Sequence, residues 1–509
     1  MHRLAAVPGS SSPDDGVLFI EQPPAAAVLL TSADTDLTGL AALLDRDPAP
    51  LGPQRAWRGL NLASLQHPAV LDHYIRTSLA TTELVIVRLL GGRGHWSYGL
   101  EQLQLWAAAH QGRHLVVLAG TAEEETALCS LGTLPEPLAQ ACSQCLREGG
   151  FENWQAVARC LQAVLDQRQP ETPQLLRLAD PQPHDWRDEP GPRVGVILYR
   201  AWLQAGDGRL ASALLEALRR AGLAPRALWL SSLRDPAVQQ GVHDLLARDR
   251  VQAVLCTTSF ASVEVSEAGL GAPLWDGLGV PVLQLLCSTQ SRASWHASPV
   301  GLAPLDLTLQ VALPELDGRI TTRVGAFKEL SEADARLATS LSRYEPDPER
   351  LDWVSALVAA WCRLRATPPA ERSLALVLAN YPTRNSRLAN GVGLDTPASA
   401  AAMLGWLAEA GYALGEGPWP VDGDALIQAL LTGRSNDPES HHRPALAHLS
   451  LAAYEQWYGQ LPAEGRMQLE QRWGSPAQDP QLQPEGFLIQ GLRFGRVVVL
   501  IQPERGYDR

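Results

Sequence analysis

The chain has 509 residues, of which 46% are hydrophobic and 19% charged, enough to build several packed cores. Its formal net charge of -13 offers no basic surface for a phosphate backbone, which argues against a nucleic-acid partner. The apolar runs are shorter than the ~20 residues needed to cross a bilayer, so we expect no membrane anchor and a cytoplasmic location.

Apolar runs that resemble strands alternate with helical stretches at the start of the chain, which predicts a first α/β domain over residues 1–170. The expected strands are 26–30, 84–90 and 114–119, and the expected helices include 37–44 and 152–165. A segment rich in Pro, Asp and Gln, residues 171–192, is expected to be a linker.

Two glycines, Gly91 and Gly92, follow the strand expected at 84–90. Their G-G-x-G pattern lacks the spacing of a dinucleotide fingerprint, so we expect a turn that positions His95 and Trp96. His95 could then be a metal ligand and Trp96 could stack on a flat ring. The alternative is that both side chains are ordinary packed structure.

Seven cysteines lie scattered among apolar neighbours, as expected of reduced core thiols. Cys142 and Cys145 form a C-x-x-C pattern, which can indicate zinc or redox chemistry. Since no second pair follows and the surrounding residues are helical in pattern, a structural role is favoured.

The next segment predicts a doubly wound, flavodoxin-like domain over residues 193–345, with a parallel sheet covered on both faces. The expected strands are 194–199, 224–230, 251–257 and 280–286, and the expected helices are 209–221 and 236–248. Ligands meet such sheets at the carboxyl ends of the strands, here 199–202, 257–260 and 287–290. Those ends carry Arg200, Thr258, Ser259, Ser288, Thr289 and Gln290, which could equally cap helices.

A connecting helix is expected within residues 346–370, followed by a third region, residues 371–509. This region opens with a strand at 374–379, and a helix can begin at Thr396-Pro397. The intervening loop is much longer than the ~2–6 residues that usually join a strand to a helix. Its polar side chains suit a polar or carboxylate-bearing ligand, although a surface loop held by its own side chains is the alternative. They include Tyr381, Arg384, Asn385, Asn390 and Asp395, the last of which can also cap the helix.

Two further strands are expected at 486–491 and 495–502, joined as a hairpin. The sequence stops at Arg509, directly after the segment QPERGYD. We expect this ending to be a truncation inside a domain.

Four segments together resemble the large subunit of ATP-dependent cobaltochelatase, the CobN type, in a family that includes the large subunit of magnesium chelatase. They occur in the family's order along the chain: LVIVRLLGGRGHWSYGLEQL (84–103), PELDGRITTRVGAFK (314–328), ALVLANYPTRNSRLANGVGLDTPAS (375–399) and FGRVVVLIQPERGYD (494–508).

This resemblance implies a tetrapyrrole-binding subunit that takes part in inserting cobalt into hydrogenobyrinic acid a,c-diamide during cobalamin biosynthesis. The alternatives are a magnesium chelatase subunit acting on protoporphyrin IX, and a non-catalytic tetrapyrrole carrier or scaffold. Cobalt is then the substrate metal, and separate AAA+ ATPase and adaptor subunits would hydrolyse ATP. The chain itself has no Walker A lysine, because its sole lysine, Lys328, follows Ala326-Phe327 rather than glycine.

The resemblance also implies that two polar segments line the tetrapyrrole site. The expected substrate-binding residues are Tyr381, Arg384, Asn385, Asn390, Asp395, Gln502, Arg505 and Tyr507, with His95 and Trp96 as further candidates. The family's later motif H-x-G-x-H-G-x-x-E-W-L-P-G-K, which carries its usual catalytic and metal-handling candidates, does not occur in this sequence. Catalytic and metal-binding residues therefore stay unassigned, and we expect this chain alone to be inactive.

Overall fold

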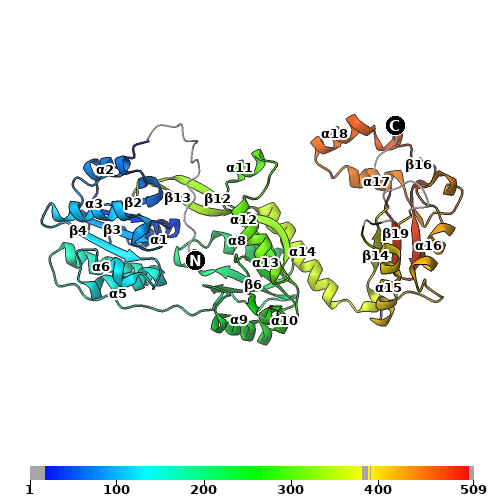
Figure 1. Cartoon of the computed structure of the whole chain (residues 1–509), viewed down its shortest axis with the longest axis horizontal. Helices are drawn as coiled ribbons and strands as arrows, with labels where there is room; N and C mark the ends of the chain where they lie inside the picture. Colours follow the sequence, from blue (N-terminus) through cyan, green and yellow to red (C-terminus); the bar gives the residue numbers. More distant parts are fainter. Residues whose placement is uncertain (1–17, 267–268, 381–387, 390, 392, 504–509) are drawn as a thin grey trace. The chain divides into compact units, whose positions relative to one another are not determined.

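The computed structural model describes residues 18–266, 269–380, 388–389, 391 and 393–503 (Figure 1). Its contacts divide the chain into two compact units, Met1–Cys362 and Arg363–Arg509. The boundary falls inside helix α14 (Pro348–Ala366). Among the described residues, none of the helices combines the length and the apolar character that crossing a bilayer requires.

The first sheet of unit 1 has four parallel strands in the order β2-β1-β3-β4. They are β1 (Ala27–Thr31), β2 (Trp57–Asn61), β3 (Leu84–Leu89) and β4 (His114–Ala119). Alternate strand residues face opposite sides, and each side is covered by helices. One side packs against α1 (Asp34–Arg46), α5 (Glu136–Glu148) and α6 (Phe151–Leu165), and the other against α2 (Pro68–Thr77) and α3 (Ser97–Ala108).

The second sheet of unit 1 has seven strands in the order β13-β12-β11-β8-β6-β7-β5. They are β5 (Gln182–His184), β6 (Arg193–Tyr199), β7 (Ala224–Leu230), β8 (Ala253–Cys256), β11 (Val282–Ser288), β12 (Ile320–Asp334) and β13 (Thr339–Pro346). The five central strands are parallel, while β5 and β13 run antiparallel at the two edges. Helices α8 (Arg209–Arg220) and α14 cover one face, and α9 (Pro236–Arg248) and α10 (Pro273–Leu278) cover the other. The expected doubly wound α/β fold is therefore confirmed.

A long hairpin, β12 and β13, extends from the second sheet to the first (Figure 1). Its tip was not expected from the sequence. Leu337 at this tip is fully buried in the core of the first domain, and its carbonyl accepts from the backbone N–H of Gly59 at 3.0 Å. The side chain of Gln22 also donates to the carbonyl of Ala338 at 2.9 Å. The hairpin therefore joins the two sheets of unit 1.

The described residues of unit 2 form two small three-stranded sheets and, after the end of α14, four α-helices. The strands are β14 (Leu374–Leu378), β19 (Val497–Ile501) and β18 (Gly491–Phe494) in one sheet, and β15 (Ala447–Leu449), β17 (Gly486–Ile489) and β16 (Leu482–Gln483) in the other. The helices are α15 (Thr396–Glu409), α16 (Gly423–Thr432), α17 (Leu451–Tyr458) and α18 (Ala463–Trp473). In the first sheet β14 and β19 are parallel neighbours.

The prediction of a hairpin between 486–491 and 495–502 is wrong for the first of these two strands. The hairpin is formed by β18 and β19, whereas β17 belongs to the other sheet. The chain switches sheets at Gly491, whose φ is 148° and where a Cβ would lie 2.1 Å from the carbonyl oxygen of Val499. Only glycine permits this close approach of two backbones.

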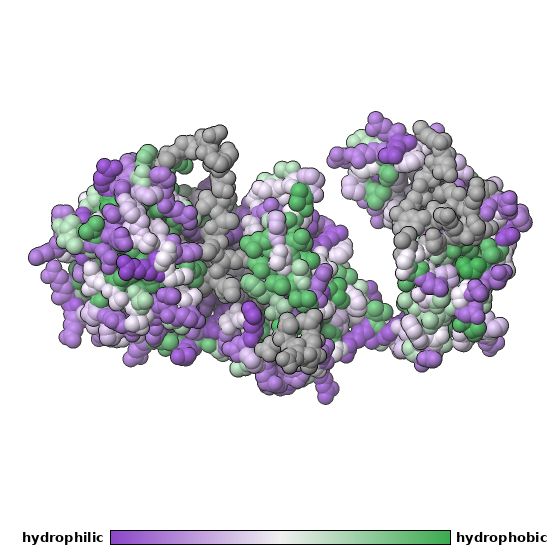
Figure 2. Space-filling view, viewed as in Figure 1, coloured by the Kyte–Doolittle hydropathy of each residue, from purple (hydrophilic) through white to green (hydrophobic). Residues whose placement is uncertain are grey.

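Short elements complete unit 1. They are α4 (Glu125–Cys129), α7 (Arg200–Gln204), α11 (Arg292–Ala297), α12 (Pro304–Leu307), α13 (Leu313–Leu316), the π-helical turn η3 (Thr308–Ala312), β9 (Glu264–Ser266) and β10 (Gly269–Gly271). In Figure 2, hydrophobic residues gather around α12 and α13, where Leu305, Leu307 and Leu316 are exposed.

Candidate functional site

The polar loop predicted to hold a ligand begins at the carboxyl end of β14 and ends at the start of α15. Asp395 is exposed, and its Oδ1 accepts from the backbone N–H of Ala398 at 3.0 Å, so it caps α15. Asn380 is buried, and its Oδ1 accepts from the N–H of Ala389 at 3.1 Å, which ties the two ends of the loop together. The predicted site residues Tyr381, Arg384, Asn385 and Asn390 lie outside the described residues.

The second predicted polar segment starts beside the first. The backbone N–H of Gln502 donates to the carbonyl of Leu378 at 3.0 Å, one residue beyond the pair formed by Leu378 and Ile501. The carbonyl of Gln502 accepts from the side chain of Asn436 at 3.2 Å. Both segments therefore leave the same edge of one sheet next to each other. Arg505 and Tyr507 lie outside the described residues, so their part in a ligand site stays a prediction.

His95 and Trp96 occupy different environments. His95 is exposed at the end of the helical turn η2 (Arg93–His95). The ring of Trp96 is buried in the core beneath the first sheet, and its Nε1 donates to the carbonyl of Leu65 at 3.4 Å. The structure therefore gives Trp96 a packing role, because its faces are covered by other core side chains.

All seven cysteines are buried and none of them forms a disulfide, as expected. Cys142 and Cys145 lie on α5 in the core of the first domain. A hydrogen bond with Cys160 and burial raise the pKa of the Cys142 thiol, and burial raises the pKa of Cys145 to about 11. Both thiols are thus protonated at neutral pH. Within the described residues, no group of three His, Cys, Asp or Glu side chains is placed to hold a metal ion.

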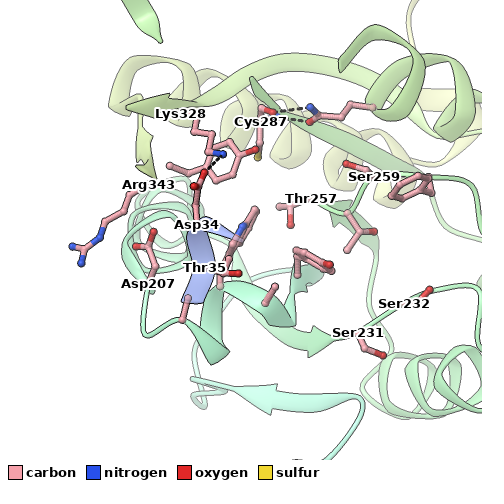
Figure 3. A pocket seen from close by; sticks show the side chains of 18 of the residues that line it. Asp34, Thr35, Asp207, Ser231, Ser232, Thr257, Ser259, Cys287, Lys328 and Arg343 are labelled. Atoms are coloured by element: carbon pink, nitrogen blue, oxygen red, sulfur yellow. Dashed lines mark hydrogen bonds and ion pairs between the residues drawn. The ribbon is translucent and has the colours of Figure 1, made fainter. Parts of the chain in front are cut away.

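A cavity of about 170 Å³ lies in unit 1 at the carboxyl ends of the strands of the second sheet (Figure 3). Its wall comes from the segments that follow β6, β7 and β8, together with the end of β11, the hairpin and the first turns of α1. The lining residues are Asp34, Thr35, Thr38, Tyr199, Ala201, Trp202, Ala205, Asp207, Ser231, Ser232, Leu233, Arg234, Thr257, Thr258, Ser259, Phe260, Ala261, Cys287, Gln310, Lys328, Ser342, Arg343 and Tyr344. The cavity is therefore enclosed by both α/β domains of unit 1.

A buried ion pair holds the segment that follows β8, which forms one side of the cavity and is called its lip below. Asp317 and Arg319 come from the PELDGRI segment, have no exposed side-chain surface and lie 2.6 Å apart. Asp317 accepts from the N–H groups of Ser262 and Val263 at 2.8 and 2.9 Å, and Arg319 donates to the carbonyl of Thr258 at 3.2 Å. Asp317 and Arg319 therefore position the cavity wall without lining it.

A second buried clamp holds the end of β11. The amide of Gln310, in the π-helical turn, accepts from the N–H of Cys287 at 2.7 Å and donates to its carbonyl at 2.6 Å (Figure 3). Asp306 is fully buried and accepts from the N–H of Thr289 at 2.7 Å. Phe260, in the lip after β8, has a φ of 71°. A bulky residue keeps this backbone conformation only when its surroundings impose it. These contacts make the cavity a pre-formed one.

One ion pair crosses the cavity wall between domains. The Nζ of Lys328 in β12 lies 2.7 Å from Asp34 Oδ2 at the start of α1, and Asp34 Oδ1 accepts from the side chain of Asn61 at 2.8 Å (Figure 3). Sequence reasoning did not identify Asp34 or Lys328 as neighbours. The only available signal for Lys328 was that it is the sole lysine and lies in a segment that resembles the family.

The strand ends predicted to meet a ligand do border the cavity. Among the polar residues named there, Thr258 and Ser259 line it. The others have structural partners: Arg200 pairs with Glu148 and Asp180, Thr289 donates to Asp306, and the N–H of Gln290 donates to Ser288. Most of these polar residues therefore have a structural role, and ligand contact by Thr258 and Ser259 stays a prediction.

The fold and this cavity define a multidomain α/β protein with a doubly wound domain whose strand ends open onto a ligand-sized space. Residues 143–509 match the model of the family described as CobN/Magnesium Chelatase. The chain belongs to that family, as its four matching segments predicted.

Similar proteins agree with this assignment. The chain is 38% identical to the aerobic cobaltochelatase subunit CobN of Pseudomonas aeruginosa and 35% identical to that of Sinorhizobium sp, in each case over 100% of this chain and 41% of the relative. The catalytic subunit of cobaltochelatase from Mycobacterium tuberculosis has a similar structure, with a TM-score of 0.67 and 30% identity over 94% of this chain and 39% of that one. Magnesium-chelatase H subunits are more distant relatives. The chain thus spans about two fifths of the length of these cobaltochelatase relatives.

Proposed function

We propose that this chain is all or part of the tetrapyrrole-binding large subunit of an ATP-dependent cobaltochelatase, which inserts cobalt into hydrogenobyrinic acid a,c-diamide in cobalamin biosynthesis. The observation that carries the proposal is the 38% identity to an aerobic cobaltochelatase subunit across the whole chain. The greater distance of the magnesium-chelatase H subunits supports a corrinoid over protoporphyrin IX.

The tetrapyrrole site in this proposal is formed by the loop after β14 and the segment after β19. The two segments begin next to each other, which supports the proposal: the N–H of Gln502 donates to the carbonyl of Leu378. Arg384, Asn385, Asn390, Gln502 and Arg505 would hold the carboxylate and amide groups on the rim of the ring, with Tyr381 and Tyr507 beside it. Asp395 would contribute by fixing the start of α15, where it already caps the helix.

Metal insertion requires the cobalt ion to lose water, two ring N–H groups to lose protons, and the macrocycle to deform. Arginine and asparagine side chains that grip the rim can hold the ring in place for these steps, because charge-assisted hydrogen bonds are strong and directional. Cobalt is the substrate metal in this scheme. ATP would be hydrolysed by separate AAA+ ATPase and adaptor subunits, which agrees with the lack of a Walker A lysine in this sequence.

We also propose a cytoplasmic setting for this reaction. The absence of a disulfide among the seven cysteines supports it, because disulfides are rare where thiols are kept reduced.

The test is a titration of the purified chain with hydrogenobyrinic acid a,c-diamide and, separately, with protoporphyrin IX, followed by absorbance. We expect the corrinoid to bind more tightly. Arg384→Ala and Arg505→Ala should each weaken corrinoid binding by roughly tenfold to a hundredfold, since a hydrogen bond to a charged group contributes about 1.5–3 kcal/mol. Arg472→Ala, which removes an exposed arginine of α18 in the same unit, is the matched control and should leave the affinity unchanged.

Three results would contradict this proposal. Tighter binding of protoporphyrin IX would favour a magnesium chelatase, and no binding of either ring would favour a scaffold. Unchanged corrinoid affinity in both arginine variants would show that the tetrapyrrole site lies elsewhere in the chain. A second assay adds cobalt, ATP and partner subunits, and there we expect binding without turnover, so complete metal insertion would refute the inactivity of this chain alone.

A further inference from the structure

The cavity of unit 1 lies at the topological switch point of the doubly wound sheet. Counting only the parallel strands, the chain forms β6 first, adds β7 on one side, and then adds β8, β11 and β12 on the other. The segments after β6 and β8 therefore diverge, and both line the cavity. Ligands of open α/β sheets bind at such crevices.

The size of the cavity limits its occupant. Each water-sized group needs at least roughly 10–15 Å³ of such space, so a cavity of about 170 Å³ takes on the order of ten of them. This is the size of one or two fused rings. A whole tetrapyrrole is several times larger.

The charges around the cavity favour an uncharged occupant. Lys328 is already paired with Asp34, and Arg343 extends away from the cavity in Figure 3. Arg234 is exposed to solvent. A ligand carboxylate or phosphate would therefore find no cation directed into the cavity among these residues.

The segment after β6 also lacks the features of a phosphate cradle. Tyr199 is followed directly by the five-residue helix α7. The two glycines that precede α8, Gly206 and Gly208, flank Asp207, whose carboxylate lines the cavity and would repel a phosphate. The guanidinium of Arg200 is buried and held by Glu148 and Asp180. This distinguishes the site from the phosphate-binding crevices of nucleotide-binding sheets.

Aromatic rings and hydroxyl groups form the rest of the wall. Trp202 lies 5.6 Å from Tyr344 and 6.3 Å from Tyr199, measured between ring centroids. All three rings are half-buried and line the cavity, so an inserted flat ring can pack against them. Ser231, Ser232 and Thr35 also line the cavity, and each of their hydroxyls can both donate and accept a hydrogen bond.

We propose that this cavity binds the base of an uncharged purine nucleoside against Trp202, while the ribose lies outside the enclosed space, toward the exposed Ser231 and the half-buried Ser232. This is a second small-molecule site, independent of the tetrapyrrole site. It stands on the geometry of unit 1 alone, so it does not require the proposed cobaltochelatase activity.

The test is isothermal titration calorimetry of the whole chain with adenosine and guanosine, each up to millimolar concentration. We expect at least one of them to bind, and AMP and GMP to bind more weakly than their nucleosides. Trp202→Leu should weaken binding by about fivefold to a hundredfold, because stacking of a base on an aromatic side chain contributes about 1–3 kcal/mol. Trp361→Leu is the matched control, since Trp361 packs against the same core from α14 without lining the cavity.

A second variant guards against a folding defect in Trp202→Leu. Ser232→Phe fills the cavity from the loop after β7 and should abolish binding while the circular dichroism spectrum stays unchanged. The proposal is overturned if neither nucleoside binds, if the monophosphates bind more tightly, or if Trp361→Leu has the same effect as Trp202→Leu. Displacement of bound nucleoside by hydrogenobyrinic acid a,c-diamide would also overturn it, whereas failure of corrinoid binding leaves it intact and counts only against the proposed function.

Discussion

Asp317 and Arg319 form a completely buried pair whose partners are the backbone groups of the lip after β8. A buried charge is tolerated because its partner and the surrounding hydrogen bonds compensate for the water it has lost. Removing one member leaves the other unpaired, which is far more costly than losing an exposed pair.

Asp317→Asn should therefore lower the free energy of unfolding by about 3–5 kcal/mol, measured by urea denaturation. Glu315→Gln changes an exposed carboxylate two residues earlier and should stay within about 0.5 kcal/mol of the unchanged chain. Equal effects of the two substitutions would show that the pair does not stabilise the fold.

Asp395 gives a second test at this scale, because its carboxylate caps α15. Asparagine caps a helix about as well as aspartate, whereas alanine loses about 0.5–2 kcal/mol. We expect Asp395→Asn to retain both thermal stability and corrinoid affinity, and Asp395→Ala to lose stability. Weaker corrinoid binding by Asp395→Asn at unchanged stability would instead indicate direct contact with the ligand.

Some of these roles could be predicted from the sequence and others could not. The capping role of Asp395 was one of two readings of a local pattern, since an acidic residue directly before Thr-Pro is placed to accept from the N–H groups of the first helical turn. The pairing of Lys328 with Asp34 joins residues 294 positions apart, and nothing local to either residue indicates the other. Such contacts follow from the tertiary fold alone.

At the scale of elements, the hairpin β12–β13 connects the two sheets that enclose the cavity. Its tip places Leu337 in the core of the first domain, while Leu330 on the same hairpin is 54% exposed. The hairpin thus contacts the first domain through one deeply buried side chain and through hydrogen bonds that its backbone carbonyls accept.

Leu337→Ala should cost about 2–5 kcal/mol, because it leaves a cavity in a packed core. Leu330→Ala, the matched control, should change the free energy of unfolding by no more than about 0.5 kcal/mol. Hydrogen exchange of the first-domain amides near Gly59 is a second readout, and unchanged protection there in Leu337→Ala would contradict the docking role of the tip.

Seven parallel strands of the two sheets were predicted to within a few residues, because buried parallel strands are continuous apolar runs bounded by turns: β1, β3, β4, β6, β7, β8 and β11. β7 and α9 match their expected bounds. The hairpin was missed because the outer half of β12 is polar and solvent-exposed, so it lacks that signal. β2 was missed for a related reason, since its sequence WRGLN is short and mixed in character.

At the scale of the whole molecule, the two compact units carry the two proposed sites separately. The cavity lies in unit 1, and both predicted polar segments start in unit 2. Chains with several domains commonly depart from two-state unfolding. A ligand that binds one folded unit raises the stability of that unit by mass action, by about 2.7 kcal/mol at a hundred times its dissociation constant.

Differential scanning calorimetry should therefore resolve two transitions, of which a corrinoid shifts one and a purine nucleoside the other. Trp361→Leu should keep the nucleoside shift, and Arg472→Ala should keep the corrinoid shift. A single transition moved equally by both ligands would contradict the assignment of the sites to different units.

Lys328, the sole lysine of the sequence, sits against Asp34 beside the cavity. Its ε-amine is thus the single side-chain target for an acylating reagent, apart from the α-amino group. The rate of its modification can be measured from the mass of the peptide that contains Lys328. That rate reports when the two α/β domains of unit 1 separate or when a ligand fills the cavity between them. The chain thereby contains a chemical reporter of its own cavity that needs no engineered label.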